Sequence, residues 1–141
     1  MTATPNRWLV KSEPSSWSWQ DQMGVESEPW TGVRNHQAAN FLRSMRPGDT
    51  VFFYHSVQEK RIVGIARVVS DPYPDPTDPD GRWTVVDLKA MRPFERPVTL
   101  AEIKADPRLA DLPLIRQSRL SVMPIDETSW KILCDLGGVG S

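Results

Sequence analysis

Four short segments combine polar side chains with aromatic or charged ones at points where one expected element ends and another begins. They are residues 11–14 (Lys-Ser-Glu-Pro), 30–35 (Trp-Thr-Gly-Val-Arg-Asn), 54–56 (Tyr-His-Ser) and 117–121 (Gln-Ser-Arg-Leu-Ser). A flat ligand such as a nucleobase is bound by stacking on an aromatic ring and by a few fixed hydrogen bonds to its edge. The four segments contain the residue types for that chemistry, so together they are a candidate ligand pocket.

Each segment also has a purely structural explanation. Asn35 is a good helix N-cap, and Trp30 could belong to the core. Glu13 could form a surface ion pair with Lys11 or Arg34, which contributes little to stability. The arginine of the last segment could serve only to fix a loop. From the residues alone, the chain is a soluble α+β domain with a polar and aromatic pocket.

Other kinds of site find less support. His36 and His55 are the only histidines and do not have metal-ligand spacing, so we expect no metal and no cofactor. His55, Ser56 and Asp87 could be imagined as a hydrolase triad. However, neighbours on a strand point to opposite faces, and the G-x-S-x-G turn is missing. Glycine-rich phosphate loops are absent. Cys134, the only cysteine, is expected to be a small buried hydrophobe.

Composition indicates one ordinary globular domain of 141 residues, with 39% hydrophobic and 25% charged residues. No apolar run is long enough to span a membrane, and no signal peptide is recognisable, so we expect a soluble, cytoplasmic monomer. The net charge is −1, but residues 71–80 alone carry four aspartates and no base, which leaves +3 on the rest. We expect this acidic segment to be an exposed loop that is dispensable for folding and opposes nucleic acid, so that replacing its aspartates with asparagine strengthens binding to unmodified DNA or RNA.

Residue patterns predict a mixed, strand-dominated α+β domain with a small curved sheet or barrel and peripheral helices. Asn35 should cap a helix over residues 35–46, and Gly64 should mark a bulge or a close backbone approach. The expected strands are residues 7–11, 50–56, 61–70, 83–91 and 120–125. The other expected helices are residues 15–23 with Ser15 or Ser16 as cap, a short one capped by Thr99, and one that runs from Asp126 to Gly137. Residues 106–116 should be irregular, and residues 137–140 a frayed tail.

Three motifs in the same segments point to a family. K-S-E-P at residues 11–14, W-x-G-V-R-N at 30–35 and F-Y-H-S at 53–56, in that order, resemble the EVE domain of the PUA-like superfamily. The resemblance covers about residues 7–136, so residues 1–141 are interpreted as a single EVE domain. It implies a PUA-like mixed β pseudo-barrel with peripheral helices, related to the YTH domain, which captures a methylated adenine in an aromatic pocket.

This resemblance also implies a function, that of a non-enzymatic reader of a modified nucleobase, above all a modified cytosine, in DNA or RNA. Trp30 or Tyr54 would stack on the base, and Asn35 and Ser12 would bind its edge. The cations of the pocket would contact flanking phosphates. The implied site residues are Lys11, Ser12, Glu13, Trp30, Val33, Arg34, Asn35, Tyr54, His55, Ser56, Arg119 and Ser121.

Two alternatives from other classes stay open. The first is an enzyme that acts on a nucleobase or small nucleotide, with Glu13 or His55 as the acid or base. The second is a sensor of a free small molecule. In every case we expect the ends of strands 7–12 and 50–56 to converge with segment 30–35 on one preformed concavity.

Overall fold

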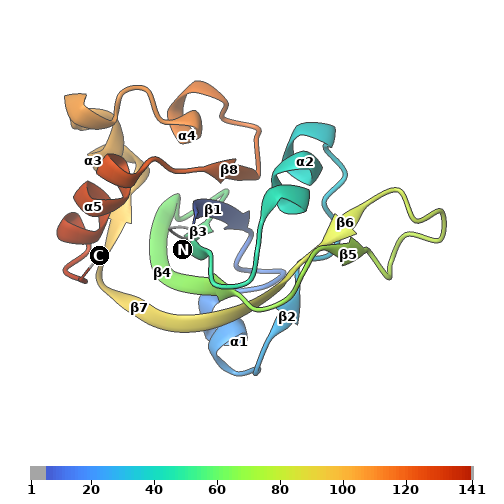
Figure 1. Ribbon diagram of the computed structural model, residues 1–141. Helices are drawn as coiled ribbons and strands as arrows, with labels where there is room; N and C mark the ends of the chain where they lie inside the picture. Colours follow the sequence, from blue (N-terminus) through green and yellow to red (C-terminus); the bar gives the residue numbers. More distant parts are fainter. Residues whose placement is uncertain (1–5, 141) are drawn as a thin grey trace, which may run out of the picture.

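A strongly curled six-stranded sheet forms the centre of the fold, with the helices around its periphery (Figure 1). The computed structural model describes residues 6–140. The elements in chain order are β1 (Arg7–Ser12), α1 (Trp19–Met23), β2 (Glu28–Pro29), α2 (His36–Ser44), β3 (Thr50–His55), β4 (Arg61–Val68), β5 (Tyr73–Pro74), β6 (Thr84–Val85), β7 (Asp87–Thr99), α3 (Leu100–Ala105), the 3-10 helix η1 (Pro107–Leu109), α4 (Pro113–Arg116), β8 (Val122–Pro124) and α5 (Glu127–Leu136). The predicted mixed α+β class is confirmed.

The strand order in the sheet is β2–β7–β4–β3–β1–β8, and β5 pairs separately with β6. β1 and β3 run parallel, with Ser12 opposite His55, whereas the other pairs are antiparallel. The parallel pairing matters for function, because it brings the carboxyl ends of β1 and β3 to the same edge of the sheet. Two of the candidate binding segments are therefore neighbours.

Aromatic side chains fill the inside of the curl. Residues 51–55 of β3 are all buried, as expected for a strand between two others in a covered sheet. Phe52 stacks on Trp130 of α5, with ring centres 3.7 Å apart, and meets Phe94 of β7 edge to face at 5.5 Å. A fully buried side chain of this size contributes about 1.5–3 kcal/mol by its removal from water. These contacts fix α5 and β7 onto the central strand.

Gly64 has the role that the sequence predicts. The register of β4 shifts between Ile62 and Gly64, and a Cβ atom at position 64 would lie 2.5 Å from the Trp19 ring. The absence of a side chain thus lets the buried indole of Trp19 pack directly on the strand. This contact anchors α1 to the sheet.

Three of the four predicted helices begin at their predicted caps. The side-chain oxygen of Asn35 accepts the Ala38 N–H at 2.9 Å, and Thr99 and Asp126 cap α3 and α5 in the same way. α1 differs, because its cap is Ser18 rather than Ser15 or Ser16. The preceding residues are used in a turn, in which the N–H groups of Ser16 and Trp17 both donate to the Glu13 carbonyl at 2.9 Å.

Several other expectations are wrong. The strand expected at residues 83–91 is interrupted after Val85, and β7 continues to Thr99 through two prolines. Pro93 is tolerated because it lies opposite Gly64, where the register with β4 is shifted. Residues 106–116 are not irregular throughout, since they contain η1 and α4.

The expected frayed tail is also wrong. The Val139 N–H donates to the Cys134 carbonyl, and the Arg96 N–H donates to the Gly137 carbonyl, both at 3.0 Å. The residues after α5 are thereby held against β7. Cys134 itself is buried, as predicted. Within residues 6–140, no helix combines the length and the apolar character that crossing a membrane requires.

Candidate functional site

A cavity of about 470 Å³ lies among the end of β1, the short strand β2 and the segment that leads into α2. This volume is within the range of small-molecule pockets, roughly 300–1,000 Å³. The lining residues are Lys11, Ser12, Glu13, Ser16, Trp17, Glu28, Pro29, Trp30, Thr31, Gly32, Val33, Arg34, Asn35 and Ser121. The cavity therefore collects eight of the twelve predicted site residues.

Lys11 holds one wall of the cavity together. Its Nζ donates to the Ser118 carbonyl at 2.9 Å and lies 5.8 Å from the centre of the Tyr54 ring. Its backbone N–H donates to the Ser121 carbonyl, also at 2.9 Å. Burial lowers the pKa of Lys11, because the charged ammonium is partly removed from water. The ammonium thus fixes residues 118–121 beside β1.

Two tryptophans face the cavity, and one of them was not among the predicted site residues. Trp30 is only 8% exposed and packs edge to face on Phe53 at 5.6 Å. Trp17 is less deeply buried, and its indole N–H donates to Gln22 at 2.9 Å. Gln22 is itself buried and donates to the Leu88 carbonyl at 2.8 Å. The Trp17 ring is therefore held in one orientation beside the cavity.

Ser12 contributes to the same support. Its hydroxyl donates to the Trp17 carbonyl, so it holds the turn that carries Trp17. Trp17 lies three residues after the end of the K-S-E-P motif, in the turn that begins at Glu13. The sequence pattern predicts a helix over residues 15–23, but α1 begins at Trp19, so this prediction is wrong for Trp17.

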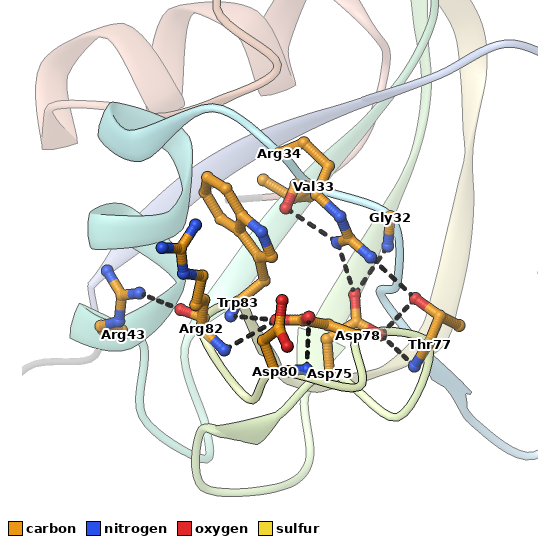
Figure 2. A network of polar contacts seen from close by, with 10 residues as sticks. All are labelled: Gly32, Val33, Arg34, Arg43, Asp75, Thr77, Asp78, Asp80, Arg82 and Trp83. Atoms are coloured by element: carbon orange, nitrogen blue, oxygen red, sulfur yellow. Dashed lines mark hydrogen bonds and ion pairs between the residues drawn. The ribbon is translucent and has the colours of Figure 1, made fainter.

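Asp75 joins the wall of the cavity to the loop between β5 and β6 (Figure 2). Its carboxylate accepts the Gly32 N–H at 2.9 Å and the Arg34 guanidinium at 3.1 Å. It also accepts the N–H and the hydroxyl of Thr77, at 2.7 and 2.6 Å. Gly32 has a φ of +85°, a conformation that other residues rarely adopt, so the backbone at this point depends on both glycine and the carboxylate.

The Asp75 side chain is fully buried. Burial by itself raises the pKa of Asp75, but the hydrogen bonds from Thr77, Gly32 and Arg34 outweigh it and lower the pKa to about 2. The carboxylate is therefore ionised at neutral pH. Segment 71–80 is largely exposed, as predicted, but the prediction is wrong at Asp75, whose partners lie far away in the sequence.

Asn35 has one hydrogen-bonding group occupied and one available. Its side-chain oxygen caps α2, whereas its amide nitrogen has no hydrogen-bond partner within residues 6–140. The residue is exposed and lines the cavity. It can cap the helix and donate to a ligand at the same time.

Two carboxylates complete the polar lining. Glu13 is exposed and accepts a hydrogen bond from the Ser15 hydroxyl at 3.0 Å. Glu28 is half-buried, and its pKa is raised by burial and by the nearby negative charge of Asp87. The cavity thus offers acceptors as well as the Asn35 donor. Among residues 6–140, no group of three or more His, Cys, Asp or Glu side chains is placed to hold a metal ion.

Comparison with known families agrees with the three sequence motifs. The EVE domain model matches residues 6–136. The chain belongs to the EVE domain family. The curled sheet with its peripheral helices is the PUA-like fold that this membership implies.

Relatives of this EVE domain occur in bacteria and animals. An NMR structure of a protein from Rhodopseudomonas palustris is 52% identical, with a TM-score of 0.90 over 94% of this chain and 93% of that one. Human thymocyte nuclear protein 1 is 32% identical over 165 residues, which cover 93% of this chain and 73% of the human protein. A crystal structure of human THYN1 protein in complex with 5-methylcytosine containing DNA has a TM-score of 0.89 and 30% identity, and covers 96% and 99% of the two chains.

Four predicted site residues of this EVE domain lie outside the cavity lining: Tyr54, His55, Ser56 and Arg119. Tyr54 is buried behind Lys11, and burial raises its pKa to about 12. The Ser56 N–H donates to the Ser12 carbonyl at 2.9 Å, which continues the strand pairing. Arg119 is exposed. The expected convergence therefore holds for Ser12 and Asn35 but not for His55.

His55 has a structural role in the EVE domain. It is 8% exposed, and its Nε2 accepts the Trp19 N–H at 3.0 Å. Its Nδ1 lies 2.9 Å from Glu59, to which it donates, because Nε2 is already used as an acceptor. Both ring nitrogens are thus occupied, and the bond to Nε2 fixes the start of α1. Of the two residues considered as acid or base, only Glu13 lines the cavity.

Proposed function

We propose that this EVE domain is a reader that binds one modified cytosine base of DNA in the cavity beside β1. The observation that carries the proposal is the complex of human THYN1 with 5-methylcytosine containing DNA, a protein that shares this fold at a TM-score of 0.89. The cavity supports it, since a single base is the part of a nucleic acid that fits about 470 Å³.

Stacking would come from the two tryptophans of the lining. Base-aromatic stacking contributes about 1–3 kcal/mol per base in proteins that bind single strands. Trp17 is the more accessible of the pair, and its hydrogen bond to Gln22 holds the ring in place before a ligand arrives. We therefore propose Trp17 as the main platform and Trp30 as the floor beneath the base.

Hydrogen bonds to the base edge would come from Asn35 and from the carboxylates. The free amide N–H of Asn35 suits the ring acceptors of cytosine. Glu13 and Glu28 suit its exocyclic amino group, since carboxylates accept from cytosine N4. A uracil or thymine base has no such amino group, so this arrangement favours cytosine. Within a duplex the base would have to be flipped out, which costs a few kcal/mol.

The test is an Asn35→Asp variant. Aspartate keeps the oxygen that caps α2 and replaces the amide NH₂ group with a second, negatively charged oxygen, so the fold should be unaffected. We expect at least about tenfold weaker binding of a short single-stranded oligonucleotide with one 5-methylcytosine, because the hydrogen bond from Asn35 is lost and the base acceptor faces a negative charge. Fluorescence anisotropy measures the affinity, and thermal unfolding checks the fold.

Two controls define the outcome. The Asp126→Asn variant changes a cap far from the cavity in the reverse sense and should bind as the wild type does. Equal affinity of the wild type and Asn35→Asp would contradict the role of Asn35. Failure of the wild type to bind any modified oligonucleotide would overturn the proposed function.

Three further measurements on the wild type separate the alternative functions. A ligand recovered in altered form would favour the enzyme, with Glu13 as the acid or base. Binding of the nucleoside with no gain from the oligonucleotide would favour a sensor of small molecules. An RNA oligonucleotide that binds better than DNA would move the proposal to RNA. The cytoplasmic location and the monomeric state stay predictions.

A further inference from the structure

Beside the cavity, three side chains form a stack, and of these only Arg34 lines the cavity. The Trp83 ring lies 4.9 Å from the His36 ring, at an angle of 33°. The Arg34 guanidinium lies over the Trp83 ring, 5.8 Å from its centre. We call Arg34, Trp83 and His36 the outer stack. His36 is exposed, Trp83 is half-buried, and the Arg34 side chain is 41% exposed.

The outer stack is continuous with the cavity. Arg34 and Asn35 line the cavity, and His36 is the first residue of α2. Three consecutive residues span at most about 10 Å, so a strand whose base enters the cavity passes the outer stack within a nucleotide or so. The outer stack is thus an aromatic surface next to the cavity on this side.

Asp78 holds Trp83 in position. Its carboxylate accepts the backbone N–H groups of Asp80, Arg82 and Trp83, at 2.9, 2.7 and 2.9 Å (Figure 2). These bonds lower the pKa of Asp78, although burial acts in the opposite direction. The Trp83 carbonyl in turn accepts the Asp75 N–H at 2.8 Å. The loop is therefore ordered before any ligand binds.

Cations lie next to the outer stack. Arg43 of α2 donates to the Arg82 carbonyl at 2.9 Å and to Asn40 at 2.7 Å. Arg82 is exposed, and its guanidinium has no hydrogen-bond partner within the part of the chain that the structure describes. The carboxylates of Asp75 and Asp78 are occupied by the hydrogen bonds described above. Of the acidic residues in the loop between β5 and β6, only Asp80 is exposed to solvent. Arg82 is available for a phosphate.

Resting on the proposed function, we propose that the outer stack and Arg82 form a contact surface for the nucleotide next to the bound base. The exposed ring of His36 packs on the flanking base, and the guanidinium of Arg82 contacts its phosphate. This gives the loop between β5 and β6 a part in binding nucleic acid, beside its part in holding Gly32 and Arg34.

The test compares two ligands on three variants. The ligands are free 5-methyl-2′-deoxycytidine and a short single-stranded DNA oligonucleotide that carries the same base. The variants are His36→Ala, Arg82→Ala and the control Lys104→Ala. All three residues are exposed, and α3, which carries Lys104, lies away from the β5–β6 loop in Figure 1. Thermal unfolding establishes that each variant is folded.

We expect His36→Ala to weaken oligonucleotide binding at least about fivefold, since one stacked base is lost. Arg82→Ala should weaken it as well and reduce the slope of log affinity against log salt by about 0.7, the value for one phosphate contact on a single strand. Neither variant should change nucleoside affinity, and Lys104→Ala should change nothing.

Three results have separate meanings. If the wild type binds the nucleoside and both variants bind the oligonucleotide as the wild type does, the outer stack is not a contact surface, and the proposed function stands. If the wild type binds neither ligand, the proposed function and this surface fail together. A loss of nucleoside affinity in His36→Ala would show that the residue acts on the cavity, and would also overturn the surface.

Discussion

Replacing Trp30 with alanine is expected to destabilise the fold by about 3–5 kcal/mol, the range for a large aromatic side chain removed from a core. Trp30 is 8% exposed and packs on Phe53, and its backbone N–H donates to the Val86 carbonyl at 2.9 Å. The indole is therefore part of the core as well as of the cavity wall. Urea unfolding followed by circular dichroism measures the loss.

Trp17→Ala is the matched comparison, because it removes the other indole of the cavity from a less buried position. We expect a smaller loss of stability in Trp17→Ala and a loss of about 1–3 kcal/mol in base binding. The assignment of platform and floor would be reversed if Trp30→Ala were nearly as stable as the wild type but unable to bind, while Trp17→Ala bound normally.

The second large effect is expected from Asp75→Asn. This change removes one of two acceptor oxygens that together receive four hydrogen bonds, and it places an N–H₂ group against the donors of Gly32, Arg34 or Thr77. Hydrogen bonds to a charged group contribute about 1.5–3 kcal/mol each, so we expect a loss of stability of about that size. Asp80→Asn makes the same change of charge in the same loop at an exposed position and should stay within about 0.5 kcal/mol of the wild type.

The pH dependence of stability gives an independent check on Asp75. Its pKa falls from an ordinary 3.8 to about 2 on folding, so the folded state holds the ionised form more tightly. The resulting stabilisation is complete above about pH 5 and is lost as the pH falls through about 2. The stability difference between the wild type and Asp75→Asn should shrink over that interval. A difference that stays constant down to the lower limit would show that the carboxylate is not the stabilising group.

Local signals predicted much of the fold. Asn35 before an apolar stripe, and the runs around Phe52 and Ile65, each encode their own element within a few residues. The role of Gly64 could also be predicted locally, because a glycine inside a strand indicates either a bulge or a close backbone approach. The continuation of β7 past residue 91 was missed, because Pro93 and Pro97 argue against a strand unless the bulge opposite Gly64 is known.

The candidate site was harder to predict, because its parts are joined by contacts between residues far apart in the sequence. Asp75 meets Gly32, 43 residues away, and nothing near Asp75 in the chain indicates that partner. His55 stands in a family motif and still turns to Trp19 and Glu59 rather than to the cavity. The motifs therefore located the region of the pocket, whereas which side chains face it depended on the packing of α1.

The most direct test of the pocket as a base-binding site uses the six tryptophan indole N–H groups as reporters in a two-dimensional ¹H–¹⁵N NMR titration with 5-methyl-2′-deoxycytidine. A free nucleoside has no flanking nucleotide, so only the cavity should respond. We predict that the signals of Trp17 and Trp30 shift with a common binding curve, while those of Trp8 and Trp130, which lie outside the cavity lining, stay in place. Unchanged Trp17 and Trp30 signals at a saturating nucleoside concentration, or shifts confined to the other tryptophans, would contradict a base-binding pocket beside β1.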